Sequence, residues 1–412
     1  MPDDIQPGNT ASNFGGVAYA RHADELTLHV TIGAEFHHLR VDRADLGLSG
    51  ISRLTLPAPV QYVVPHPTRS LMYVATSNRS ISKADDLHTL TTVAVDERTG
   101  VLRAIGQSTL PSRPIHLTVA PRAEGVLVVY NLPAGITWHA IDGDGVAGGA
   151  AVQDPPPALG AYPHQVRMLP SAEAAVVVVR GNHATPQRGE ESGALEFLSW
   201  RRGVLAPLST VAPNGGFGFG PRHLDFHPAG RWAAVSMERE NELQVFAVRD
   251  ADFAAEPAFR TSTLQPQSGP TCGSPHDQLC GAIHFHPRGD RLYVANRHDP
   301  SVYGPAGQPC DYAGNNIAVY AFDAASGRAE ALQYVPTESV HVRTFSLDRS
   351  ARLMATASIL PAISKRDGRV ERVASRITFL RVADDGRLTL ARVHDMPYDR
   401  SSTFWSHLDG RL

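Results

Sequence analysis

The sequence predicts an all-β chain that repeats one antiparallel hairpin unit. Its clearest copy runs from Gly220 to Glu238, where apolar and polar residues alternate up to a His-Pro-Ala-Gly turn. The apolar stretch from Trp232 to Met237 has the character of the returning strand. Because the two strands run antiparallel, Arg222 and Glu238 are expected at the same end of the hairpin.

The same unit recurs along nearly the whole chain. Five sister copies run from Pro59 to Ala75, Arg113 to Tyr130, Tyr162 to Arg180, Cys280 to Arg297 and His341 to Ser358. The six turns, at positions 67, 121, 170, 228, 287 and 349, lie 49 to 62 residues apart, a spacing typical of propeller blades. With 35 Gly and 31 Pro and little helical periodicity, the composition favours many short strands joined by turns.

Each later unit continues into a second hairpin, whose tip is approximately Asp-x-x-x-Gly-x-Leu, so that it has the four strands of a propeller blade. Examples are residues 93–102, 319–329 and 379–388. The strand-like N-terminal stretches, by contrast, lack an innermost strand. They are Val17–Tyr19, Leu26–Ile32 and Phe36–Val41.

The C-terminal run Thr403–Ser406 can supply the missing strand. Pairing with residues 14–50 would close a seventh blade and remove the exposed sheet edges of an open array. The sequence therefore predicts a seven-bladed β-propeller of four-stranded antiparallel blades, closed by N- and C-terminal strands in one blade. Six or eight blades are the alternatives if the N-terminal segment pairs differently.

Residues 1–412 are expected to form a single domain, since no Ser/Gly-rich or charge-rich linker interrupts the repeat. The 38 basic and 41 acidic residues give no electrostatic footprint for nucleic acid or an anionic membrane. The first residues lack a basic segment followed by an apolar one, and the densest apolar run, Ala174–Val179, is too short to span a bilayer. We expect a cytoplasmic protein with a small soluble partner; the sequence leaves its oligomeric state open.

Charged residues recur where innermost strands start and where second strands end. His164, Arg222 and Arg343 occupy starts, and Glu238 and Arg297 occupy ends. In a blade, these two positions lie on one face beside the central channel, so the five residues should converge. Since the planar guanidinium fork binds carboxylates and oxyanions bidentately, the set predicts a small anionic substrate.

Four of these positions carry a resemblance to a known family. Tyr-Pro-His164, Gly-Pro-Arg222-His, Ser-Met-Glu238 and Ala-Asn-Arg297 resemble the seven-bladed β-propeller lactonases, which include bacterial 6-phosphogluconolactonases and fungal carboxy-cis,cis-muconate cyclases. The resemblance covers residues 14–408. It implies a cofactor-independent lactonase acting on a small anionic lactone of a sugar acid or related compound, with these four residues as the catalytic set.

The chain departs from the family at two early strand ends. Bacterial phosphogluconolactonases tend to carry Asn-Glu and Ala-Asn-Tyr-Gly-Gly there, whereas this chain has Ala75-Thr76-Ser77-Asn78 and Val129-Tyr130-Asn131-Leu132. This difference weakens the assignment of a sugar-phosphate lactone as the substrate. Long connections on the same face should shape a pocket. They are residues 76–88, 181–193, 265–280 and 297–315.

Two reactions and one binding role fit these residues. In hydrolysis, Glu238 or His164 takes a proton from water while Arg222 and Arg297 hold the oxyanion, without metal or organic cofactor. In the reverse bond change, a muconate carboxylate adds across a double bond to form a lactone on the same four residues. A non-catalytic propeller that binds a protein partner would need an apolar or aromatic face, yet aromatics are only 7% of the chain.

The remaining histidines divide into two groups. His183 and His116, together with Arg343, are candidate substrate-binding residues. His66, His227 and His286 each precede the proline of a repeat turn, so turn structure explains their recurrence.

The three cysteines indicate no disulfide framework, because their number is odd and the chain is long. A local link between Cys272 and Cys280 stays open. A zinc site of Cys272, His276, Cys280 and Cys310 is also conceivable from spacing, but free thiols and no metal are the default prediction.

Overall fold

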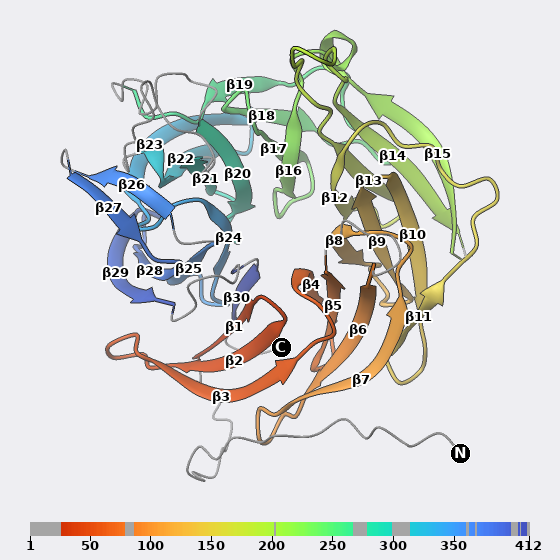
Figure 1. The fold of residues 1–412 in the computed structure, drawn as a ribbon. Helices are drawn as coiled ribbons and strands as arrows, with labels where there is room; N and C mark the ends of the chain where they lie inside the picture. The colour runs from red at the N-terminus through yellow and green to blue at the C-terminus, as the bar shows by residue number, and fades with distance from the viewer. Residues whose placement is uncertain are drawn as a thin grey trace, which may run out of the picture.

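The computed structural model describes residues 26–78, 86–201, 203–266, 278–298, 314–359, 362–366, 369–396, 403 and 405–409. Within these residues, seven four-stranded antiparallel sheets stand around a central axis (Figure 1). The predicted seven-bladed propeller is therefore confirmed, and the alternatives of six or eight blades are wrong.

Six blades follow one another along the chain, and each begins with its innermost strand. The first three are β4 (Val60–Pro65), β5 (Leu71–Ser77), β6 (His88–Val95) and β7 (Leu102–Thr109); β8 (Pro114–Val119), β9 (Gly125–Asn131), β10 (Ala134–Ile141) and β11 (Ala147–Ala150); and β12 (Pro163–Met168), β13 (Ala174–Val179), β14 (Ala194–Arg201) and β15 (Val204–Val211). The short 3₁₀ helix η2 (Pro213–Gly216) connects the third of these blades to the next.

The other three blades complete this series. They are β16 (Pro221–Phe226), β17 (Trp232–Met237), β18 (Glu242–Ala247) and β19 (Phe259–Ser262); β20 (Gln278–Phe285), β21 (Arg291–His298), β22 (Asn316–Asp323) and β23 (Arg328–Pro336); and β24 (Val342–Leu347), β25 (Leu353–Ser358), β28 (Arg376–Val382) and β29 (Leu388–Asp395). The last blade also carries an inserted hairpin, β26 (Ala362–Arg366) with β27 (Arg369–Val373), which the repeat did not predict.

The seventh blade joins the two ends of the described chain. It consists of β1 (Leu26–Ile32), β2 (Glu35–Val41), β3 (Leu48–Thr55) and β30 (Trp405–Asp409). Strand β30 pairs with β1 from Thr27↔Asp409 to Thr31↔Trp405, next to the axis (Figure 1). The predicted closure is confirmed, although the strand starts and ends later than expected. Val17–Tyr19 and Phe404 lie outside the described residues.

The hydrophobic core lies between blades. One cluster, for example, joins Val176 and Phe197 of one blade to Val235 and Phe246 of the next. Because each blade is covered on both faces, the strand next to the innermost one is buried along almost its whole length, and β13 is an unbroken run of Ala and Val. Outermost strands are mostly exposed instead, as in β15, where only Leu205 and Val211 are buried.

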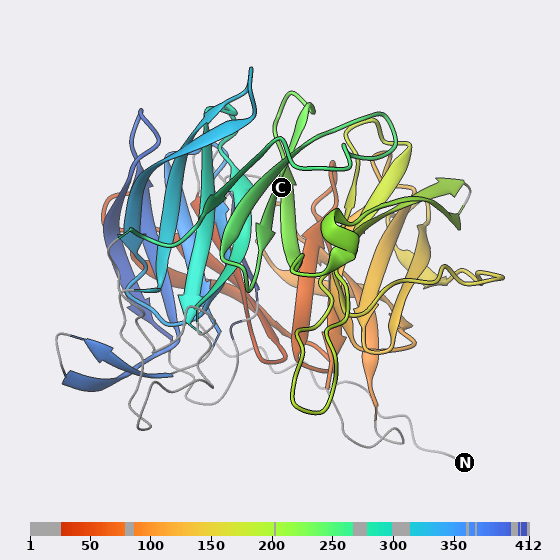
Figure 2. The ribbon, with the colours of Figure 1, turned by 90° about the horizontal axis from the view of Figure 1, so that it is seen from above.

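The channel has two different ends. We call the end where innermost strands start and second strands finish the site face, and the end that carries the hairpin turns between those strands the turn face. The connection 181–193 and the β26–β27 hairpin both follow second strands, and they project from the site face (Figure 2). No helix in the described part of the chain is long and apolar enough to cross a membrane.

The histidines of the repeat turns have a structural role on the turn face. The Nδ1 atoms of His66, His227 and His286 each accept a hydrogen bond from the backbone N–H two residues later, at 3.1 Å. These bonds fix the turn, which explains why the His-Pro pair recurs without any need for chemistry.

Candidate active site

A β-bulge at a repeated position shapes the channel lining. In β16 the pairing with β17 shifts between Pro221 and His223, and the same shift occurs near the start of the other innermost strands of the consecutive blades. A bulge adds one residue and re-aims its side chain. The side chains of Arg222 and the following His223 are therefore both directed away from the core between blades. Strict alternation along the strand would have directed one of them into that core.

Glu238 is the centre of a buried ion-pair cluster at the site face. Its Oε1 accepts from Nη1 of Arg222 and, at 2.5 Å, from Nη2 of Arg297. Its Oε2 accepts from Nη1 of Arg180 at 2.8 Å. Arg222, Glu238 and Arg297 are only 3%, 2% and 1% exposed. The structure thus brings three of the four predicted catalytic residues into direct contact, but as partners of one another inside the protein.

Arg180 is the member of this cluster that sequence reasoning missed. Its backbone N–H donates to Tyr162 O, as that of Glu238 donates to Gly220 O, so the two residues hold equivalent positions in successive blades. Aligning strand ends would have found it. The guanidinium also lies 4.0 Å from the ring centre of Tyr162. Tyr162 has φ +61°, a conformation that is strained for an aromatic residue and is concentrated at functional sites.

The electrostatics make Glu238 a permanent anion. Burial alone would raise the pKa of its carboxyl, but Arg222, Arg297 and Arg180 outweigh burial and hold this pKa far below its usual range. A carboxylate stabilised so strongly has little tendency to accept a proton.

His164, on the innermost strand β12, is buried close to the arginines of the cluster, and its imidazole is neutral. Burial, followed by the positive charges of Arg222 and other neighbours, holds its pKa well below the usual value. Its ring centre is 5.1 Å from that of His223. The buried Nδ1 of His164 has no hydrogen-bond partner within the described residues. A neutral imidazole can accept a proton, which the ion-paired Glu238 cannot readily do.

Positive charge is in excess at the site face. Arg180, Arg222 and Arg297 surround one carboxylate, and Arg343 is close enough to lower the pKa of His164 and of His223 further. The Nε and Nη2 atoms of Arg222 are buried without a partner in the described structure. Buried cationic donors without acceptors are costly, so this arrangement suits an anionic ligand.

In the β8–β11 blade, which precedes the blade of Arg180, Asn131 occupies the position equivalent to Arg180 and Glu238. Asn131 ends β9 next to Tyr130, which pairs with Pro114 as Met237 pairs with Pro221. Asn131 is buried, and neither atom of its amide is hydrogen-bonded in the described part of the protein.

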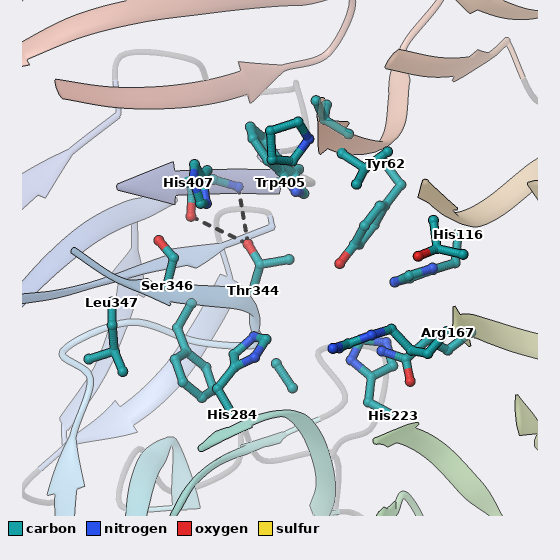
Figure 3. A pocket seen from close by; sticks show the side chains of 18 of the residues that line it. Tyr62, His116, Arg167, His223, His284, Thr344, Ser346, Leu347, Trp405 and His407 are labelled. Atoms are coloured by element: carbon teal, nitrogen blue, oxygen red, sulfur yellow. Dashed lines mark hydrogen bonds between the residues drawn. The ribbon is translucent and has the colours of Figure 1, made fainter. Parts of the chain in front are cut away.

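The two other predicted histidines lie elsewhere. His183 sits in the site-face connection, where its Nε2 is 3.8 Å from Glu240 Oε1. His116 lies deeper, with its ring 4.0 Å from that of Tyr62, on the wall of a cavity that continues toward the turn face (Figure 3). Neither contacts Glu238, so their predicted role in binding substrate remains a prediction.

Comparison with known proteins agrees with this architecture. Residues 27–359 match the family described as Lactonase, 7-bladed beta-propeller. The chain belongs to this family. Among curated proteins of the lactonase family, it is similar to the 6-phosphogluconolactonase of Bacillus subtilis, at 26% identity over 80% of this chain and 82% of that protein. The 6-phosphogluconolactonase of Erwinia tasmaniensis is 22% identical over 73% and 78% of the two chains.

A solved lactonase structure has the same fold. The periplasmic gluconolactonase PpgL of Pseudomonas aeruginosa superposes with a TM-score of 0.70, with 17% identity over 93% of this chain and 99% of that chain.

The described residues of this lactonase-family chain contain no group of three or more His, Cys, Asp or Glu arranged to hold a metal. Cys280 is a free, buried cysteine whose thiol donates to Met237 O at 2.8 Å. Burial raises the pKa of this thiol, which therefore stays protonated. Cys272, His276 and Cys310 of the conceivable zinc site lie outside the described residues.

Proposed function

We propose that this protein hydrolyses a small lactone that carries a negative charge. The observation that carries the proposal is the buried cluster of Arg180, Arg222 and Arg297 around Glu238, with Arg222 donors left over. These cations favour both an anionic substituent and the oxyanion that develops at a lactone carbonyl. Membership of the lactonase family and the curated 6-phosphogluconolactonases support the same reaction class.

In the proposed mechanism, His164 is the base. Its neutral imidazole takes a proton from water while the water oxygen bonds to the ring carbonyl carbon. Arg222 and Arg297 stabilise the resulting tetrahedral oxyanion. When the intermediate collapses, the ring C–O bond breaks and the His164 imidazolium returns its proton to the leaving alkoxide. The product is a hydroxy acid, which ionises at neutral pH.

Glu238 acts as a positioning residue in this scheme. Removing its carboxylate would leave Arg180, Arg222 and Arg297 repelling one another inside the protein. Glu238 holds the three guanidinium groups in one arrangement before the substrate binds. Because these donors need not reorganise when the oxyanion forms, they lower the activation free energy more effectively.

The test is a screen of the purified protein against glucono-1,5-lactone, its 6-phosphate, muconolactone and carboxymuconates. Acid release is followed by a pH indicator, and loss of muconate by ultraviolet absorbance. We expect release of acid from a charged lactone and a fall of about 10²–10⁴ in kcat for His164→Gln. Wild-type kcat in a folded His164→Gln variant would remove His164 as the base.

The same screen separates the alternatives. Conversion of a muconate without hydrolysis of any lactone would replace the hydrolase proposal by the cycloisomerase. No turnover of any compound would favour the non-catalytic propeller. The cytoplasmic location stays a prediction.

A further inference from the structure

The channel holds a second feature below the arginine cluster, toward the turn face. It is a cavity of about 550 Å³, a size typical of small-molecule sites. We call it the axial cavity. Its walls come from the innermost strands of all seven blades, from Tyr62 on β4 to His407 on β30, and Figure 3 shows their side chains around an open centre. Arg222, Glu238 and Arg297 are not among its lining residues.

Hydrogen-bonding side chains converge on one half of the axial cavity. Tyr62, His116, Arg167, His223 and His284 come from five successive innermost strands (Figure 3). His116 is only 4% exposed, and its Nδ1 has no hydrogen-bond partner in the described structure. Such a buried, unsatisfied atom costs free energy unless a ligand or water reaches it. The opposite half is mixed, since Phe345 and Trp405 lie there beside the polar Thr344, Ser346, Ser406 and His407.

One guanidinium group in the cavity wall has its counter-charge outside the lining. Arg167 lines the cavity and donates from Nη2 to Asp225 Oδ1 at 3.0 Å, while Asp225 itself is not among the lining residues. The second oxygen of the same carboxylate, Oδ2, accepts from Phe285 N–H at 2.9 Å and lies 3.7 Å from His284 Nδ1. Asp225 fixes the Arg167 fork without occupying the cavity.

Asp348 is the acidic residue that does line the cavity, but its oxygens are already engaged. Its Oδ1 accepts from the N–H groups of Arg352 and Leu353, each at 2.8 Å, and its Oδ2 accepts from the Ser350 hydroxyl. These bonds belong to its own turn. Besides Asp348, the charged groups that line the cavity are the guanidinium groups of Arg167 and Arg349, and one phenol and four imidazoles add further hydrogen-bonding atoms.

We propose that the axial cavity is a second binding site, which takes a small hydroxylated carboxylate through Arg167, His284 and Tyr62. Arg167, held in place by Leu224 O and Asp225, supplies a positive charge and further N–H donors for a carboxylate, and the imidazoles and the phenol supply hydrogen bonds to hydroxyls. This site shares the channel with the arginine cluster but none of the Glu238 ion pairs. It stands whether or not the protein hydrolyses lactones.

The experiment measures binding of sodium gluconate by titration calorimetry, with sorbitol as the uncharged comparison. Thr118→Trp fills the cavity from the β8 wall, Arg167→Lys keeps the charge that Asp225 needs but loses the fork, and His284→Gln removes the imidazole. Arg222→Lys is the matched control at the other site. Unfolding curves without ligand verify that each variant is folded.

We expect a saturable gluconate-binding component whose affinity falls at least ~10-fold in Thr118→Trp and in Arg167→Lys and which persists in Arg222→Lys. A crystal soaked in 3-bromobenzoate, whose aryl bromine does not alkylate imidazoles, should show bromine within the axial cavity. If Thr118→Trp does not fold, Arg167→Lys and His284→Gln decide the question.

Three results would overturn the proposal. They are sorbitol binding as tightly as gluconate, loss of binding in Arg222→Lys but not in the cavity variants, and bromine found only beside Arg222 and Arg297. A protein that binds gluconate in the cavity but hydrolyses no lactone would contradict the proposed function alone.

Discussion

Two blades of this propeller share one backbone plan and differ in chemistry. In the β4–β7 blade and the β16–β19 blade, the innermost strand bulges at the same position. At the end of the second strand, Ser77 in one blade and Glu238 in the other donate their backbone N–H to the carbonyl oxygen of the residue before the first strand. Both hydrogen bonds are 2.9 Å long. The two side chains nevertheless differ completely. The blade supplies positions, and individual residues supply the reaction.

The contrast extends to the bulged residue. In the β4–β7 blade it is Gln61, which accepts a hydrogen bond from Arg113 Nε at 3.1 Å and remains neutral. In the β16–β19 blade it is Arg222, bound to Glu238. A neutral amide needs only a partner, whereas a buried guanidinium needs a counter-charge. We therefore expect substitutions in the two blades to differ in both stability and activity.

The largest difference is expected between Glu238→Gln and Ser77→Ala. Loss of the carboxylate removes the counter-charge of two buried guanidinium groups, Arg222 and Arg297, and of the partly buried Arg180, and breaking a buried ion pair costs about 3–5 kcal/mol. Glu238→Gln should therefore lower the melting temperature and reduce kcat/KM by about 10²–10⁴, while Ser77→Ala changes each little. Thermal unfolding and steady-state kinetics measure both. A Glu238→Gln enzyme with wild-type stability and KM but a much lower kcat would instead identify Glu238 as the base.

A smaller difference is expected between Arg222→Lys and Gln61→Asn. Lysine keeps the positive charge but not the two-pronged geometry, so kcat/KM for an anionic lactone should fall by about 10²-fold. Gln61→Asn alters a contact outside the cluster and should leave kcat/KM within about threefold. Equal effects of the two substitutions would mean that charge asymmetry around the channel does not matter.

The residue after the bulged one is His223 in the β16–β19 blade and Tyr62 in the β4–β7 blade. These two residues should differ in how they make the free energy of unfolding depend on pH. Burial, followed by Arg222, His116 and other neighbours, holds the pKa of His223 well below its usual value. The unfolded chain binds a proton there below about pH 6.5 while the native protein does not. His223 thus favours the folded state above that pH, and stability is lost as the pH falls below it, by about 1.4 kcal/mol per pH unit.

His223→Gln should therefore flatten the fall in unfolding free energy between pH 6.5 and the lower native pKa, and Tyr62→Phe should not. Denaturant titrations at several pH values measure both slopes. Parallel curves for His223→Gln and the wild type would show that the imidazole takes up a proton in the native protein as well.

The smallest expected effect is that of chelation. Because arginines supply the charge stabilisation in the proposed mechanism, EDTA should leave kcat/KM unchanged. Loss of turnover that calcium or zinc restores would contradict the metal-free mechanism and shift attention from the arginine-bearing blades to a metal site.

The fold was predictable because its signals are local. His-Pro turns and alternating apolar residues placed the starts of six innermost strands within two residues of their positions in the structure. The inserted β26–β27 hairpin was missed because it lies in a connection that does not follow the repeat. Neither periodicity nor turn chemistry constrains an insertion of that kind.

The candidate site was only partly predictable. Sequence placed Arg222, Glu238 and Arg297 at one end of the channel, but it gave no reason to pair them with one another or to bury them. The pairing depends on the bulge and on Arg180 from the preceding blade. Such contacts join residues 58 or 59 positions apart, and only the packing of neighbouring blades brings them within reach.

Closure of the ring by β30 has a consequence for how the protein is made. Thr27 and Asp409 are hydrogen-bonded across 382 positions of the chain, so the innermost strand of their blade is the last to be synthesised. During translation, the edge of β1 stays unpaired until β30 is made. The apolar surface that Trp405 of β30 covers stays exposed for the same time. The ring therefore stays open, with the edge of β1 exposed, until β30 has been made.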